Sequence, residues 1–322
     1  MKVNAICDID EDRLLEIQKK YGVPFTTSDY REVLERDDVD VAAVFTPDHH
    51  HAGQCIDAMA SGKHVFVTKP MVTNMRDCKT VIKTVRETGL TCLVGETVRF
   101  HALNLKVKEL LDSGIFGKPV YIEAHYVHDL RPVYRITPWR VSSPQDLLLG
   151  GGCHPIDHVR WYFGDIEEVH CYSNRSGLTS EYPLNENFTL NLKFKNGAIG
   201  RILDLHGCVE PPMPMLGLMM CGTKGTVCNN ELVFEKNGVQ VKDTLEESRE
   251  IKMARNGISA TDQEKLCHLE EVIRCLRHLR DCILHGIKPV PDAVEGAKTI
   301  AVALAAWESL RKKDAVKVRT NF

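Results

Sequence analysis

Residues 39–70 read VDVAAVFTPDHHHAGQCIDAMASGKHVFVTKP, and this stretch decides the fold. Its apolar runs from Val39 to Phe45 and from His64 to Val67 predict two short buried strands. Between them, Ala52 to Ala60 predicts a helix that ends at Gly62. Two buried strands joined by a helix form a parallel pair with a crossover connection. The stretch therefore predicts one unit of a doubly wound α/β sheet.

The same alternation of predicted strands and helices continues on both sides of this unit. Upstream, Val3 to Cys7 predicts a strand and Glu11 to Tyr21 a helix. Downstream, Arg76 to Glu87 predicts a helix and Thr91 to Gly95 a strand. Residues 1–98 are thus expected to form a Rossmann-like domain with a parallel sheet.

The pattern changes after Phe100. Long alternating stretches such as Val120 to His128 and Phe188 to Phe194 predict strands with one buried face. Asn196-Gly197 predicts a hairpin turn leading into Ala198 to Leu205. Residues 99–322 are therefore expected to form an α+β domain with a large, mainly antiparallel sheet.

Two long helices are expected to close the chain. They run from about Ser259 to His285 and from Asp292 to Lys312. The last helix is able to pack back on the first domain.

Composition and charge exclude several classes of partner. The chain has 322 residues and a formal net charge of -3, without the basic stripe of a nucleic-acid-binding protein. Its apolar stretches fall short of the roughly 20 residues that cross a membrane. Neither a signal peptide nor a transit peptide is recognisable, so we expect a cytoplasmic protein with a small-molecule partner.

Asp8 ends the first predicted strand. A carboxylate there can accept hydrogen bonds from the ribose hydroxyls of an adenosine and repel a 2'-phosphate, which favours NAD over NADP. The alternative is a helix N-cap, because Asp8 and Asp10 both precede a helix.

Two further segments follow predicted strands at the carboxyl edge, where such folds bind ligands. Thr46-Pro47 leads into three consecutive histidines that end with His51. Adjacent side chains diverge, so we expect no single metal ion to be held by this tripeptide. Lys69 can hold a substrate hydroxyl and lower the pKa of a neighbouring base. The alternative for Lys69 is a solvated surface charge.

Residues 150–158 form the densest group of reactive side chains. His154, Asp157 and His158 share one helix face, and Pro155 fits the first turn of that helix. In one hypothesis His154 is a general base supported by Asp157. In another, His154 and His158 imitate a zinc motif with Asp in place of Glu, which would make a metal-dependent hydrolase. The preceding glycines and the lack of an evident third ligand argue against zinc, and a structural role is a third alternative, so we expect no metal here.

Taken in order, these segments resemble the Gfo/Idh/MocA family of oxidoreductases over essentially the whole chain. The matching pieces are residues 5–8, Thr46-Pro47 with His51, residues 62–65, Lys69-Pro70, Arg99-Phe100, residues 152–154 with Asp157 and Trp161, residues 222–225 and residues 305–309.

The resemblance implies a Rossmann domain followed by an α/β domain whose open sheet often makes homo-oligomer contacts, here a dimer or a tetramer. It also implies NAD or NADP chemistry on sugars, glycosides, inositols or other polyols, and Asp8 favours NAD. Lys69 then corresponds to the catalytic lysine and also binds cofactor and substrate, while His154 is the acid/base and Asp157 its support. The same resemblance places four further substrate-binding residues over the pocket: Tyr126, His128, Trp139 and Arg140.

Two departures from the family pattern affect the site. Thr68 stands where the family has a glutamate before Lys69, so the carboxylate beside the lysine is lost. Gly150 stands where the family often has an aspartate four residues before His154, so Asp157 is expected to carry more of that role.

The third departure is at the start of the chain. Val3 to Cys7 corresponds to the second strand of the family, so the first strand, the G-x-G-x-x-G turn and the first helix are expected to be missing. Val3 to Cys7 would then have no neighbour joining it to Val39 to Phe45, and the pyrophosphate would lose its cradle of backbone N–H groups. We prefer a truncated reading frame as the explanation. A strand donated by a partner chain and a protein that no longer binds the dinucleotide are the alternatives, and we expect weak NAD binding by these 322 residues.

The sequence therefore predicts an NAD-dependent dehydrogenase acting on a secondary hydroxyl of a sugar, glycoside or polyol. A related possibility is cleavage of a glycosidic bond through transient oxidation with a retained cofactor. A non-catalytic sensor or interaction protein and a metal-dependent hydrolase using His154 and His158 are the other hypotheses.

Overall fold

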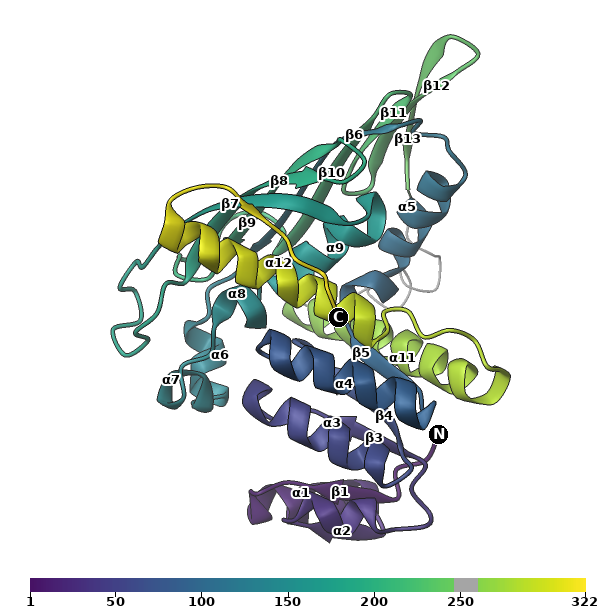
Figure 1. The fold of residues 1–322 in the computed structure, drawn as a ribbon, viewed down its shortest axis with the longest axis vertical. Coiled ribbons are helices and arrows are strands. Elements are labelled where there is room, and N and C mark those ends of the chain that lie inside the picture. Colours follow the sequence, from purple (N-terminus) through teal and green to yellow (C-terminus); the bar gives the residue numbers. More distant parts are fainter. Residues whose placement is uncertain (246–259) are drawn as a thin grey trace. The chain divides into compact units, whose positions relative to one another are not determined.

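The polypeptide forms two compact units. The structure is a computed structural model and describes residues 1–245 and 260–322. The first unit comprises Met1–Gly95, Leu276–Glu295 and Phe322 (Figure 1). The second comprises Glu96–Cys275 and Gly296–Asn321.

The strands of the first unit are short and parallel. Strands β3 (Val41–Val44), β4 (His64–Thr68) and β5 (Cys92–Gly95) form one sheet in that order. Strand β1 (Ala5–Cys7) pairs with β2 (Phe25–Thr27) in a separate sheet. The parallel pair predicted within residues 39–70 is confirmed.

Local capping explains where the helices of this unit begin and end. The Asp10 carboxylate accepts a hydrogen bond from the Arg13 backbone N–H, which satisfies a free donor at the start of α1. Gly22 closes the same helix in the left-handed conformation that glycine adopts at least cost. The helices are α1 (Glu11–Tyr21), α2 (Tyr30–Leu34), the 3-10 turn η1 (Asp48–His50), α3 (His51–Ala60) and α4 (Met75–Thr88).

Strands β1 and β3 belong to different sheets, and within the described part of the chain each pairs with one other strand. The Phe45 side chain, at the end of β3, is 62% exposed. Such exposure of a large apolar side chain is unusual for the central region of a doubly wound sheet, where helices cover both faces.

The second unit is built on a nine-stranded sheet with the order β13-β12-β11-β10-β6-β9-β8-β7-β14. All neighbouring pairs are antiparallel except β6 and β9, which run parallel. The predicted α+β class is therefore confirmed, and the predicted hairpin at Asn196-Gly197 connects β8 to β9. The strands are β6 (Pro119–Val127), β7 (Ile166–Asn174), β8 (Asn187–Phe194), β9 (Ile199–Leu205), β10 (Leu216–Gly222), β11 (Gly225–Cys228), β12 (Glu231–Lys236), β13 (Val239–Thr244) and β14 (Val316–Lys317).

Helix α9 packs against β6 and is buried along nearly its whole length. Its apolar residues Ile156 and Val159 are fully covered, so the helix is fixed to the sheet by the burial of both side chains. The helical segments before β7 are η2 (Thr97–Phe100), α5 (Ala102–Asp112), α6 (Arg131–Ile136), α7 (Trp139–Ser142), α8 (Leu147–Gly150) and α9 (Cys153–Phe163).

Two long helices precede the C-terminus, as the sequence predicts. Helix α11 spans Ala260–His285 and α12 spans Ala293–Lys312. The expected start of the first, Ser259, lies outside the described residues. Among the residues that the structure describes, no helix has the length and apolar character that a membrane span requires.

Candidate active site

The glycine-rich segment before α9 is shaped by two buried side chains at the carboxyl end of β9, Asp204 within the strand and His206 directly after it. A Cβ added at Gly151 would collide with the His206 ring, and one at Gly152 would lie 2.8 Å from Asp204 Oδ2. Glycine at these positions lets the loop approach both side chains closely. The loop then leads directly into Cys153 and His154, the first residues of α9.

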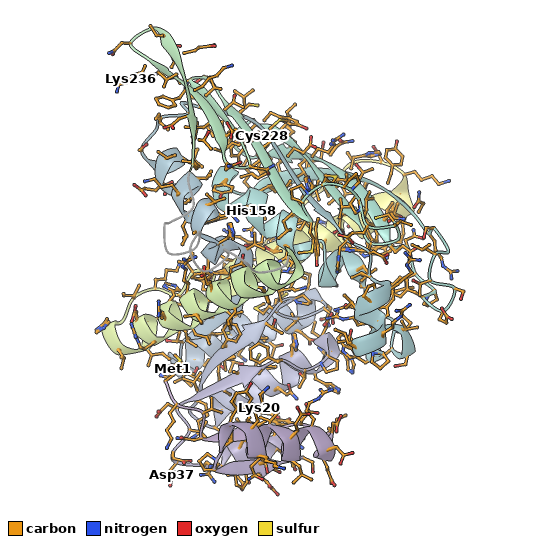
Figure 2. The ribbon with its side chains drawn as sticks, turned by 180° about the vertical axis from the view of Figure 1, so that it is seen from behind. Met1, Lys20, Asp37, His158, Cys228 and Lys236 are labelled. Atoms are coloured by element: carbon orange, nitrogen blue, oxygen red, sulfur yellow. The ribbon has the colours of Figure 1, made fainter. Side chains whose placement is uncertain are left out.

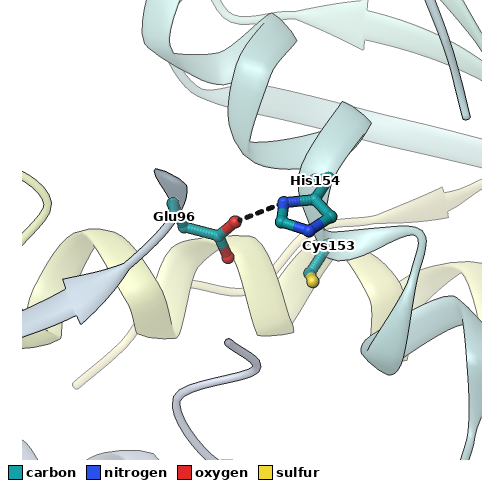
Figure 3. A group of neighbouring side chains, drawn as sticks. All are labelled: Glu96, Cys153 and His154. Atoms are coloured by element: carbon teal, nitrogen blue, oxygen red, sulfur yellow. Dashed lines mark ion pairs between the residues drawn. The ribbon is translucent and has the colours of Figure 1, made fainter. Parts of the chain in front are cut away.

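His154 pairs with a carboxylate that the sequence did not indicate. His154 Nδ1 lies 3.2 Å from Glu96 Oε2, and their side chains are only 11% and 2% exposed (Figure 3). Glu96 directly follows β5, at the start of the η2 turn. A carboxylate in this position orients the imidazole and stabilises the imidazolium that forms when the ring takes a proton. The pair is thus suited to acid/base chemistry.

Asp157, predicted to support His154, is held by a guanidinium. Arg99 Nε and Nη2 each donate a hydrogen bond of 2.6 Å to its carboxylate, and Thr299 Oγ1 donates another of 3.2 Å. The Arg99 and Asp157 side chains are 4% and 2% exposed. This contact joins η2 to α9, the same two segments that carry Glu96 and His154.

His158, labelled in Figure 2, follows one turn later on α9. Its side chain is buried. Its ring packs against Trp161 and Tyr162, with ring centroids 6.4 Å and 4.9 Å away. Desolvation by burial lowers the pKa of His158 to about 3. The ring is therefore neutral near pH 7.

Tyr126 on β6 lies beside His154, as expected of a substrate-contacting residue. Its ring meets His154 edge-on at 5.8 Å between centroids and meets His206 at 5.0 Å. The predicted His128 stacks on the Tyr126 ring with centroids 6.2 Å apart, and its Nδ1 lies 3.6 Å from Glu210 Oε2. The end of β6 thus brings both predicted residues to the His154 neighbourhood.

Asp204 and His206 form a second buried acid–histidine pair. Asp204 Oδ1 lies 2.8 Å from His206 Nε2, and both side chains are at most 1% exposed. Neither residue was predicted from the sequence as part of the site. Strand alternation could have revealed it, because Asp204 and His206 fall on the same face of the strand region as the buried Ile202.

Trp139 and Arg140 lie on the short helix α7. The Arg140 guanidinium stacks over the Trp139 ring at 4.7 Å from its centroid. Arg140 Nε donates to Thr137 Oγ1 at 3.1 Å, and Arg140 Nη1 donates to Gln145 Oε1. The guanidinium is therefore held in place by its immediate neighbours.

In the first unit, the predicted cofactor residues follow the strand ends. The Asp8 carboxylate accepts hydrogen bonds from Asp10 N at 3.0 Å and Arg13 Nη1 at 3.3 Å, while Asp10 is the N-cap. The His51 ring nitrogens lie 2.8 Å from the Thr46 carbonyl oxygen and 2.7 Å from that of Pro70.

His51 therefore connects the turn after β3, which holds Thr46-Pro47, to the turn after β4. Lys69 occupies that second turn and is joined to Pro70 by a cis peptide bond.

The residues that could hold a metal ion differ from His154 and His158, the pair that the sequence pattern offered as zinc ligands. Among the described residues, one group of three potential ligands lies close together: Glu96, Cys153 and His154. His158 is not part of this group.

Sequence models of one family match most of the chain. The model described as "Oxidoreductase family, NAD-binding Rossmann fold" matches residues 1–96. The model described as "Oxidoreductase family, C-terminal alpha/beta domain" matches residues 108–318. The chain belongs to the Gfo/Idh/MocA oxidoreductase family. The first unit of this Gfo/Idh/MocA protein carries the family's NAD-binding Rossmann domain, and the resemblance predicted from the sequence is confirmed.

Curated relatives of this Gfo/Idh/MocA protein include named glycosidases. An alpha-N-acetylgalactosaminidase from Shewanella oneidensis is 36% identical over 140 residues, which cover 41% of this chain and 30% of the relative. A glycosyl hydrolase family 109 protein from Shewanella woodyi is 34% identical with the same coverage. The match thus spans under a third of the length of these relatives.

Solved structures of similar fold are oxidoreductases. An Agrobacterium radiobacter oxidoreductase in complex with NAD+, L-tartaric acid and magnesium has a TM-score of 0.85 at 20% identity, covering 98% of this chain and 90% of that one. A levoglucosan dehydrogenase in complex with NADH and levoglucosan also has a TM-score of 0.85, at 19% identity, covering 99% and 90%. At this identity the likeness establishes the shared fold.

Proposed function

We propose that this chain is an NAD-dependent dehydrogenase that oxidises a secondary hydroxyl of a sugar, glycoside or polyol, or reduces the matching ketone. The observation that supports it best is the buried contact between His154 Nδ1 and Glu96 Oε2. Removing a proton from a hydroxyl needs a base whose protonated form is stabilised, and a buried carboxylate stabilises imidazolium.

His154 takes the hydroxyl proton in this proposal, and Glu96 holds its ring. Asp157 acts on the same site through Arg99, because their ion pair joins η2 to α9. Tyr126 contacts the substrate beside His154, and His128 stacks on Tyr126. Trp139 and Arg140 are proposed as further substrate-binding residues on the basis of the family resemblance.

The strand ends of the first unit fit the adenosine side of NAD. Asp8 offers a carboxylate at the end of β1 that can accept hydrogen bonds from ribose hydroxyls and disfavours the extra phosphate of NADP. Thr46, Pro47 and His51 form a turn that His51 fixes through the Thr46 carbonyl. Lys69 is proposed to bind cofactor and to hold the substrate hydroxyl. When bound, NAD supplies the hydride acceptor at its nicotinamide C4.

Substrate oxidation by the purified chain tests the proposal. We would follow NADH absorbance at millimolar NAD with a panel of anhydrosugars, pyranoses and inositols, and measure NAD binding separately. His154→Gln is expected to lower kcat/KM by about 100-fold or more without changing the Kd for NAD. His170→Gln, which removes a histidine on β7 of the same unit, is the matched control and is expected to remain within about twofold of the wild type.

The possible outcomes separate the hypotheses. NADH formation that survives His154→Gln would contradict the role of His154. Sugar binding without turnover would favour the sensor hypothesis. A chain that neither binds NAD nor oxidises any member of the panel would overturn the proposal as a whole.

A glycosidase is the second candidate, because the matched Shewanella relative is named alpha-N-acetylgalactosaminidase. In this alternative, a retained cofactor oxidises the sugar transiently and the glycosidic bond is then cleaved. Release of nitrophenol from a nitrophenyl N-acetylgalactosaminide, without net NADH formation, would favour it over the dehydrogenase.

A further inference from the structure

Three different ligand atoms converge at the start of α9. Glu96 offers a carboxylate oxygen, Cys153 a thiol sulfur and His154 an imidazole nitrogen, and the three atoms all lie within 4.8 Å of one another (Figure 3). All three residues are buried. Mixed nitrogen, sulfur and oxygen ligands suit zinc and other thiophilic divalent cations, whereas magnesium and calcium prefer oxygen alone.

The geometry is close to that of a site with one open position. Bond lengths of about 2.0–2.3 Å around tetrahedral zinc place ligand atoms about 3.3–3.8 Å apart. His154 Nδ1 and Glu96 Oε2 already lie 3.2 Å apart. Because all three ligand atoms lie within 4.8 Å of one another, no separation needs to close by more than about 1.5 Å. Three protein ligands leave a fourth position for water or another small ligand.

We infer that Glu96, Cys153 and His154 bind a thiophilic divalent cation such as zinc and that the bound cation inhibits the enzyme. Binding breaks the S–H bond of Cys153, whose proton leaves to solvent, and forms a metal–thiolate bond. A metal-bound neutral imidazole carries its proton on the other ring nitrogen, so neither nitrogen of His154 remains able to accept one. The inhibition rests on the proposed role of His154 as base, whereas the binding does not.

Cobalt(II) provides a readout that needs no substrate. It replaces zinc in many sites, and a cobalt–thiolate bond gives a charge-transfer absorbance that carboxylate and imidazole ligands do not give. We would titrate the metal-free chain with cobalt(II) and expect this absorbance to saturate at one equivalent. Cys153→Ser should abolish it, Glu96→Gln should weaken the affinity, and zinc should displace the cobalt.

Cys228→Ser is the matched control, because Cys228 is an exposed thiol on β11 that could bind cobalt adventitiously. It is expected to leave the absorbance unchanged. Absorbance that is lost in Cys228→Ser, or that persists in Cys153→Ser, would contradict metal binding at Cys153. Far-ultraviolet circular dichroism checks that Cys153→Ser is folded, and Cys153→Ala serves as a second variant if it is not.

Zinc inhibition is measured separately as loss of NADH formation. The wild type is expected to be at least tenfold more sensitive to zinc than Cys153→Ser. An equal sensitivity of both proteins would overturn the inhibitory role even if the cobalt absorbance is present. Cobalt absorbance that depends on Cys153 in a chain with no dehydrogenase activity would uphold metal binding and count against the proposed function instead.

Discussion

Arg99 and Asp157 form a buried ion pair with two hydrogen bonds of 2.6 Å, and this pair ties the segment after β5 to helix α9. Glu96 and Arg99 are three residues apart on one segment, as are His154 and Asp157 on the other. The two segments are therefore joined twice, once by an ion pair between buried side chains and once by the proposed acid/base pair.

We expect Asp157→Asn to destabilise the second unit by about 3 kcal/mol, because it leaves a buried guanidinium without its counter-charge. Urea unfolding followed by tryptophan fluorescence reports on this unit, since Trp139, Trp161 and Trp307 all belong to it. Lys106→Ala is the control. It breaks an exposed pair with Glu109 and is expected to change stability by less than about 0.5 kcal/mol. Equal effects of both variants would contradict a special role for the buried pair.

Glu96→Gln tests the proposed partner of His154. The amide keeps the size of the side chain but loses the charge that stabilises imidazolium, so kcat/KM is expected to fall by about tenfold to 100-fold. KM should change little, because the ground state of the substrate does not carry the developing charge. Steady-state kinetics with the best substrate measures both constants. An unchanged kcat would contradict a role for Glu96 in stabilising the His154 imidazolium.

His158 makes the stability of the protein sensitive to acid. Burial lowers the pKa of His158 to about 3 in the folded chain, so the unfolded chain takes up the proton more readily as the pH falls below about 6.5. This group alone should reduce the free energy of unfolding by about 2 kcal/mol between pH 7.5 and pH 5.

The matched variant is His158→Gln, which does not titrate. Urea unfolding at both pH values should show a smaller loss in the variant than in the wild type. The same loss in both proteins would exclude His158 as the cause.

The Asp204–His206 pair is expected to be energetically coupled. Each single replacement, Asp204→Asn or His206→Gln, should destabilise the fold by about 3 kcal/mol, because it removes one partner of a buried contact. The double variant should lose at least about 1 kcal/mol less than the sum of the two single variants. Strict additivity in this double-mutant cycle would mean that the two side chains act independently.

The sequence predicted the elements that carry strong local signals. Asp10 and Gly22 mark both ends of α1, and the predicted bounds Glu11 to Tyr21 agree with the structure. The strand Phe25–Thr27 was not predicted, because three residues are too few to show a period. Its identity as a strand comes from pairing with β1, which is a tertiary contact.

The site was predicted only in part, because some of its residues meet through tertiary contacts that leave no local signal in the sequence. His154 and Asp157 stand out because helix spacing places them on one face. Glu96 lies 58 residues before His154, and nothing in the local pattern connects the two. Asp157 was expected to support His154 more strongly because Gly150 replaces an acid of the family pattern. The carboxylate beside the His154 ring is instead that of Glu96, which comes from a different segment.

Among the residues that the structure describes, strands β1 and β3 each pair with one neighbour, so each leaves one row of backbone amides outside the ladders of these sheets. Amides without a strand partner exchange with solvent deuterium faster than those of a central strand such as β4. Local unfolding should therefore begin at these two strands. The earliest cleavage sites for a protease should lie in the connections that flank them.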